Sequence, residues 1–217
     1  MNIGVFDSGI GGEAVAQALR LAFPSANILT VNDRENVPYG DKTTHEIYTL
    51  TEKAIQPLLG QDIVVIACNT ATTLTIKSLR KAYPEQKFIG IEPMIKPAAA
   101  LTKTGLICVC ATPATLASKR YQQLKSNFAS AHQIIEPDCS QWASMIEQDN
   151  MTEQLIRETI SSALELGVDV IVLGCTHYHW IKELVQRVAK NRAIVLEPSA
   201  AIAQRVSQML GIAVASN

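Results

Sequence analysis

Two cysteines stand where a buried strand is expected to end and a helix to begin. Cys68 follows the apolar run 64–67, and Cys175 follows the run 170–174, about half the chain further on. A threonine lies within two residues of each cysteine. A single cysteine in such a place is most often a small buried apolar residue. Two in equivalent places indicate chemistry, because a helix N-terminus favours both a thiolate and an anionic group of a substrate.

Two thiols on opposite sides of one carbon atom can exchange its proton, since one removes a proton while the other delivers one. A free thiol has a pKa of roughly 8.5 and needs a partner to act as a base near neutrality. His177 is the candidate partner of Cys175, and Asp7 that of Cys68. Because a nearby carboxylate raises the pKa of a thiol, Asp7 is expected to exchange a proton rather than to stabilise a thiolate. Two plainer roles stay open: Asp7 as a helix cap, and His177 as a buried side chain bonded to backbone.

Short β-branched runs alternate with amphipathic stretches of helical length, which predicts an α/β fold with mostly parallel sheets. The runs are continuously apolar, as in sheets that are covered on both faces. The expected strands are 3–6, 28–31, 63–67, 88–91, 106–111, 133–135, 170–174 and 194–196. The expected helices are 12–23, 44–59, 71–83, 114–128, 152–166, 180–189 and 199–210.

The likeness between the two cysteine segments predicts two pseudosymmetric lobes. The first comprises residues 1–93 and 197–217, and the second comprises residues 94–196. Ligands of such folds bind beyond the carboxyl ends of the strands, which is where both cysteines stand. The sequence therefore predicts an active site in a cleft between the lobes.

A dinucleotide-binding oxidoreductase is the main alternative. Residues 9–14 match the G-x-G-x-x-A turn, and Asp33 follows at the spacing of a ribose-binding acid. Against this hypothesis, Asp7 would bring a negative charge beside the pyrophosphate, and both strand-end cysteines would have no role. A metal site is not expected, because Cys108 and Cys110 are separated by one residue rather than by the usual two to four.

The composition limits the classes of partner. The 217 residues carry a formal net charge of -1, which argues against nucleic acid or an anionic membrane surface as the main partner. No apolar run approaches the roughly 20 residues of a membrane-spanning helix. The N-terminal residues lack a signal-type segment, so a cytoplasmic protein with a small-molecule substrate is expected.

Four ordered segments carry a family resemblance: 4–12, 37–40, 67–71 and 173–178. Together with weaker matches at 90–93, 111–115 and 139–147, they closely resemble the aspartate/glutamate racemase superfamily, and glutamate racemases in particular. The resemblance implies a cofactor-independent racemase that interconverts L- and D-glutamate in a cleft between two α/β lobes. It also implies a homodimer and, in bacteria, a supply of D-glutamate for peptidoglycan.

The resemblance further implies roles for individual residues. Cys68 and Cys175 would exchange the α-proton on opposite faces of the substrate. Asp7 would assist Cys68, while His177, supported by Glu147, would assist Cys175. The positions implied to bind the carboxylates and the amine of the substrate are Asp7, Ser8, Tyr39, Gly40, Asn69, Thr70, Thr112, Thr176 and His177.

Several positions depart from the family pattern. Ser140 and His179 each replace a proline, Glu13 is unusual after the first glycine turn, and 34–36 differ before Pro38. None of these changes removes a proposed catalytic group, but together they leave open glutamate or aspartate as substrate. A relative that binds an acidic amino acid without turnover is a third hypothesis.

Overall fold

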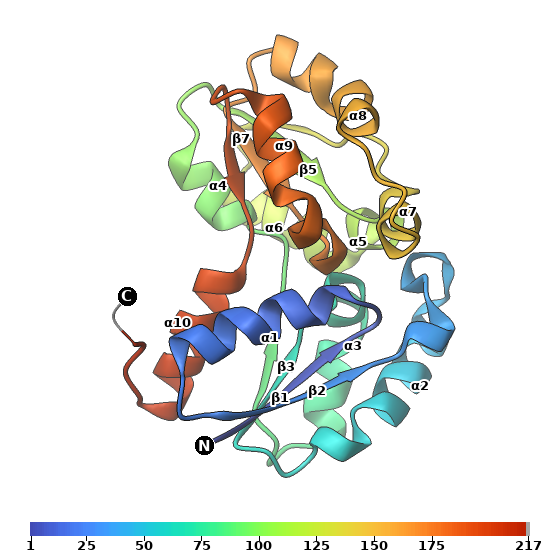
Figure 1. The fold of residues 1–217 in the computed structure, drawn as a ribbon, viewed down its shortest axis with the longest axis vertical. Helices are drawn as coiled ribbons and strands as arrows, with labels where there is room; N and C mark the ends of the chain where they lie inside the picture. The colour runs from blue at the N-terminus through green and yellow to red at the C-terminus, as the bar shows by residue number, and fades with distance from the viewer. Residues whose placement is uncertain (216–217) are drawn as a thin grey trace. The chain divides into compact units, whose positions relative to one another are not determined.

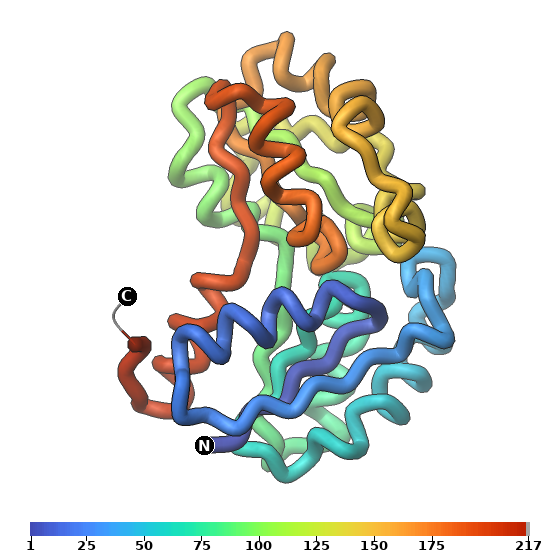
Figure 2. Tube along the Cα trace, viewed as in Figure 1, coloured from blue at the N-terminus to red at the C-terminus, as the bar shows by residue number. Residues whose placement is uncertain are grey.

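The computed structural model describes residues 1–215. Residues 216–217, which belong to the predicted first lobe, lie outside the described residues. The chain divides into two compact units, one made of Met1–Ile91 with the segment from Pro198 onward, the other of Glu92–Glu197. Figure 2 traces the chain into the second unit and back. Each unit holds a parallel four-stranded sheet with helices around it, so the predicted α/β class is confirmed.

The sheet of the first unit has the order β2-β1-β3-β4. Helices α1 and α10 pack on one face and helices α2 and α3 on the other (Figure 1). Although α10 ends the chain, it lies beside α1, where Ile202 and Val206 share a core with Val15 and Leu19. The elements are β1 (Asn2–Asp7), α1 (Gly11–Ala22), β2 (Asn27–Asn32), the 3₁₀ helices η1 (Arg34–Asn36) and η2 (Tyr39–Asp41), α2 (Thr44–Ala54), η3 (Gln56–Leu58), β3 (Ile63–Ile66), α3 (Asn69–Ala82), β4 (Phe88–Gly90) and α10 (Ser199–Leu210).

The second unit repeats this topology with the order β6-β5-β7-β8. Helices α4 and α6 pack on one face, over Val170 and Val172, and α8 and α9 pack together on the other (Figure 1). The elements are α4 (Ile95–Leu101), β5 (Leu106–Cys110), α5 (Pro113–Ala117), α6 (Lys119–Phe128), β6 (Gln133–Ile135), α7 (Trp142–Glu147), α8 (Glu153–Glu165), β7 (Val170–Leu173), η4 (Thr176–Ile181), α9 (Lys182–Ala189) and β8 (Ile194–Leu196).

The eight predicted strands are all present, but three predicted helices differ from the structure. Helix 44–59 ends at Ala54, and Pro57 follows in η3, because proline has no N–H for a continuing α-helix. Helix 114–128 is two helices, since Ser118 is extended and its hydroxyl caps the second one by accepting from the Tyr121 N–H at 3.1 Å. Helix 180–189 begins as α9 at Lys182, after the 3₁₀ helix η4.

Two helices were not predicted. The seven-residue α4 and the six-residue α7 are too short to show a helical period. Within residues 1–215, no helix is both long and apolar enough to cross a bilayer.

The two sheets place the cysteines in the same register. In the first unit, the Ala67 N–H donates to the Phe6 carbonyl at 2.7 Å. In the second unit, the Gly174 N–H donates to the Cys110 carbonyl at the same distance of 2.7 Å. The residue after each donor is a cysteine. Cys68 therefore follows β3 beside the carboxyl end of β1, and Cys175 follows β7 beside the carboxyl end of β5.

Candidate active site

Cys68 caps α3 with its sulfur. Its Sγ accepts from the Ser8 hydroxyl at 3.3 Å and from the Ala71 N–H at 3.4 Å. Burial and then the negative charge of Asp7 raise the pKa of the Cys68 thiol to about 11, although the Ser8 and backbone hydrogen bonds act in the opposite direction. The thiol of the free protein is therefore protonated at neutral pH.

Asp7 ends β1 and is almost fully buried. Its Oδ2 accepts from the Gly9 N–H at 3.0 Å, whereas α1 begins after Ile10 without a side-chain cap. The helix-cap role for Asp7 is therefore wrong. A Cβ on Gly12 would lie 2.5 Å from the Asp7 Cβ, so the glycine allows α1 to begin directly against this carboxylate.

The Gly12→Ala variant tests this close contact. Because the added methyl group overlaps the Asp7 side chain, we expect a loss of about 1–3 kcal/mol in the free energy of unfolding, together with reduced activity. Urea denaturation measures the first and an activity assay the second. Gln17→Ala, at an exposed position of the same helix, is the control. Unchanged stability and activity in Gly12→Ala would contradict the contact.

Asp33 holds the segment that carries Tyr39 and Gly40. Its Oδ2 accepts from the Tyr39 hydroxyl at 2.7 Å, and its Oδ1 accepts from the Asn36 amide at 2.8 Å. Burial and then the Asp33 contact raise the pKa of Tyr39, so its phenol stays protonated. Both Asp33 oxygens thus accept hydrogen bonds inside the protein, which argues against the ribose-binding role that the dinucleotide hypothesis gives to this residue.

The first turn of α3 contains a buried amide with no protein partner. Asn69 is 2% exposed, and neither its Oδ1 nor its Nδ2 has a hydrogen-bond partner among residues 1–215. A buried amide in this state is costly, and its polar atoms are available to a bound ligand. The buried Thr70 follows it in the same turn. These residues, with Asp7, Ser8 and Cys68, form what we call the Cys68 site.

The second unit contains a thiol, an imidazole and a carboxylate in series. The Cys175 Sγ lies 3.6 Å from His177 Nδ1, and His177 Nε2 lies 2.9 Å from Glu147 Oε1. When Nε2–H donates to the carboxylate, Nδ1 is the nitrogen that can accept the thiol proton. All three side chains are at least four-fifths buried. His177 therefore has a carboxylate partner, and the idea that it merely bonds backbone is wrong; we call these three residues the Cys175 site.

The threonines of the second unit lie at the starts of helices. Thr112 caps α5 by accepting from the Thr115 N–H at 3.3 Å, and the buried Thr176 begins η4 directly after Cys175. The register makes Ala111 the counterpart of Asp7. The two sites are therefore built alike in backbone but differ in the group beside the thiol.

The predicted residues thus fall into two groups. The structure places seven of them in the first unit: Asp7, Ser8, Tyr39, Gly40, Cys68, Asn69 and Thr70. The second unit holds the other five: Thr112, Glu147, Cys175, Thr176 and His177. Within the described part of the chain, no three His, Cys, Asp or Glu side chains are arranged to hold a metal ion.

The departures from the family pattern have ordinary surroundings. Glu13 forms an exposed ion pair with Arg20, and the Ser140 N–H donates to Asp138 at 2.9 Å. The His179 side chain is 5% exposed, and its Nε2 lies 4.0 Å from a Glu197 oxygen.

Comparison with known proteins assigns the family. The family model for Asp/Glu/Hydantoin racemase matches residues 13–206. A glutamate racemase of Herpetosiphon aurantiacus is 38% identical, over 97% of this chain and 85% of the relative. One from Pseudomonas aeruginosa is 37% identical, over 96% of this chain and 81% of the relative.

Solved structures agree in fold. Escherichia coli glutamate racemase, in complex with L-glutamate and the activator UDP-MurNAc-ala, has a TM-score of 0.88 at 28% identity, over 99% of this chain and 84% of that one. The Francisella tularensis glutamate racemase in complex with D-glutamate has a TM-score of 0.82 at 26% identity, over 97% of this chain and 81% of that one. With the family model covering most of its length, the chain belongs to the Asp/Glu/Hydantoin racemase family.

Proposed function

We propose that this protein is a glutamate racemase that interconverts L- and D-glutamate by exchanging the α-proton between two thiols. The observation that carries the proposal is the pair of buried cysteines in equivalent register, one 3.6 Å from an imidazole nitrogen of His177 and the other under the charge of Asp7. Curated relatives and solved structures with the name glutamate racemase support glutamate as the substrate.

In one direction, Cys175 is the base. His177 accepts the thiol proton at Nδ1 while Glu147 binds its Nε2–H, so the imidazolium is stabilised next to the thiolate. The thiolate then takes the α-proton of the substrate. Cys68, which is protonated at neutral pH, delivers a proton to the opposite face.

In the other direction, Cys68 is the base and Asp7 receives its proton. The resting pKa of about 11 opposes this step. A positively charged substrate ammonium beside the thiol lowers that barrier, because an opposite charge favours the thiolate. The reaction therefore starts only when substrate is bound.

The intermediate carries negative charge on its α-carboxylate. Hydrogen-bond donors placed in advance around such a charge are a large catalytic term. The side chains proposed to bind the substrate are Asp7, Ser8, Tyr39, Gly40 through its backbone, Asn69, Thr70, Thr112, Thr176 and His177. The unpartnered amide of Asn69 is the best-supported donor of this set. The proposed chemistry needs no cofactor.

The wider setting follows from the same proposal. D-glutamate made by this enzyme would supply peptidoglycan synthesis in the cytoplasm of a bacterium, and the working form would be a homodimer. Aspartate is the alternative substrate within the same chemistry.

Turnover in D₂O tests the proposal. We expect L-glutamate to give D-glutamate with deuterium at Cα, because the thiols equilibrate with solvent between turnovers. The purified protein is assayed by mass spectrometry and circular dichroism, with a chelator present and no added nucleotide. L-aspartate in a parallel sample decides the substrate. D-glutamate that retains protium, or no turnover of either amino acid, would overturn the mechanism.

A further inference from the structure

The helix that carries Glu147 is short. Helix α7 has six residues, Trp142–Glu147, and Glu147 is the last of them. So short a helix is unstable on its own and depends on tertiary contacts. The 2.9 Å contact between Glu147 and His177 therefore depends on whatever holds α7 in place.

Tyr178 provides that support from the residue after His177. The Cys139 carbonyl accepts two hydrogen bonds, one from the Trp142 N–H at 3.1 Å and one from the Tyr178 hydroxyl at 3.0 Å. The Trp142 ring packs edge-on against the Tyr178 ring, with centroids 5.2 Å apart and an interplanar angle of 66°. Tyr178 is fully buried, and burial raises the pKa of its phenol, which favours the protonated form that donates.

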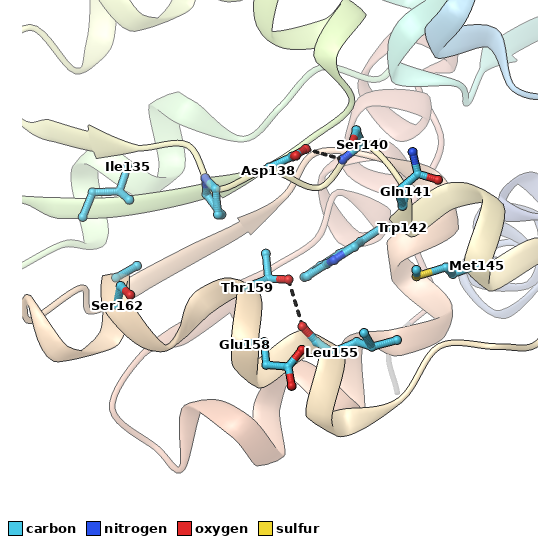
Figure 3. A pocket seen from close by; sticks show the side chains of 12 residues that line it. Ile135, Asp138, Ser140, Gln141, Trp142, Met145, Leu155, Glu158, Thr159 and Ser162 are labelled. Carbon is cyan, nitrogen blue, oxygen red and sulfur yellow. Dashed lines mark hydrogen bonds between the residues drawn. The ribbon is translucent and has the colours of Figure 1, made fainter.

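A hollow of about 530 Å³ is lined by Trp142 and Met145 of α7 and by Leu155 and Thr159 of α8 (Figure 3). The side chains around this hollow leave its volume unfilled. Close packing opposes motion only where atoms are in contact, so the Tyr178 contacts help to hold α7 beside the hollow.

We infer that Tyr178 and Trp142 are positioning residues that hold Glu147 against His177 and so tune the Cys175 thiol. This inference rests on the proposed function of the Cys175 site. The Tyr178 hydroxyl holds the start of α7 through the Cys139 carbonyl, and the Trp142 ring holds the helix against the Tyr178 ring. Neither side chain belongs to the set proposed to bind the substrate.

The test uses Tyr178→Phe, which keeps the ring and removes the hydroxyl. The matched control is Tyr121→Phe, because Tyr121 is also fully buried in the second unit and its hydroxyl donates to Glu136 at 2.7 Å rather than to the Cys139 carbonyl. The substrates are the two enantiomers of a single diastereomer of 3-chloroglutamate, which has stereocentres at Cα and Cβ. One thiolate removes the α-proton and chloride leaves, so HCl is lost without help from the second thiol.

We expect Tyr178→Phe to slow elimination from the enantiomer that Cys175 deprotonates by about tenfold in kcat, and to leave the other enantiomer within about twofold. The acid limb of the pH–rate profile should move to lower pH for that enantiomer only, because the Cys175 site loses a nearby negative charge. Trp142→Phe should show a smaller change in the same direction. Tyr121→Phe should change neither enantiomer selectively.

The outcomes separate this inference from the proposed function. If the unsubstituted protein racemises glutamate and Cys175→Ala abolishes elimination from one enantiomer only, the proposed function stands. If Tyr178→Phe then behaves like Tyr121→Phe in both rate and pH profile, the positioning role is wrong. A protein in which Cys175→Ala leaves both enantiomers unaffected would instead contradict the proposed function itself.

Discussion

Replacing either Cys68 or Cys175 with alanine is expected to reduce glutamate racemisation by at least about 10³-fold and to leave the fold intact. Racemisation needs one thiol to remove the α-proton and the other to replace it, so the loss of either stops turnover. Each thiol sits after a strand whose residues are fully buried, and alanine fills the cysteine position with little change in volume. Circular dichroism of glutamate over time measures the rate, and the protein's own far-ultraviolet spectrum verifies the fold.

The remaining thiol should still support half of the chemistry. Each single variant should eliminate HCl from only one enantiomer of 3-chloroglutamate, and the two variants should choose opposite enantiomers. Cys108→Ala is the control, because Cys108 is fully buried in β5 and is not among the proposed catalytic residues. Near-normal racemisation by either Cys68→Ala or Cys175→Ala would end the two-thiol proposal.

Asp7→Asn is expected to lower racemisation by about 10²–10³-fold while making Cys68 more reactive. Asparagine keeps an oxygen for the Gly9 N–H but has no charge and cannot take the thiol proton. Because the Asp7 charge raises the pKa of Cys68, its removal should bring that pKa down from about 11. Alkylation by iodoacetamide should therefore begin at lower pH even though catalysis is slower.

Peptide mapping of the alkylated protein, followed across pH 7–11, assigns the reaction to Cys68. Asp62→Asn is the matched control, since Asp62 accepts a backbone N–H of Asn2 at 2.8 Å near the opposite end of β1. It should change neither the alkylation nor the racemisation. Faster racemisation in Asp7→Asn, or an unshifted alkylation profile, would exclude Asp7 as the proton partner of Cys68.

The sequence predicts the place of a site residue where that residue comes immediately after a strand in the chain. Parallel strands deliver their carboxyl ends to one edge of a sheet, so the apolar runs before Cys68 and Cys175 were enough to predict both thiols at such edges. Asp7 and Ser8 follow from the same rule applied to β1. The alternation of runs and helices likewise predicted all eight strands.

Residues whose position depends on tertiary contacts could not be predicted in this way. Glu147 was reached only through the family resemblance, because α7 has no periodic pattern of its own. The contact between Tyr178 and the Cys139 carbonyl joins positions 39 residues apart and leaves no local signal. Gly12 matches both the family segment and the alternative dinucleotide-binding turn, and neither match indicates that it makes room for Asp7, as the structure shows.

The backbone likeness of the two sheets hides a chemical asymmetry. Asp7 corresponds to Ala111, and among residues 1–215 it is the second thiol that has an imidazole beside it. Mirror-image amino acids have equal free energies in water, so kcat/KM must be the same for both enantiomers at every pH. Different proton partners can then make kcat and KM differ between the two enantiomers only by the same factor. The enzyme would saturate earlier with one enantiomer than with the other, and by the same factor turn it over more slowly.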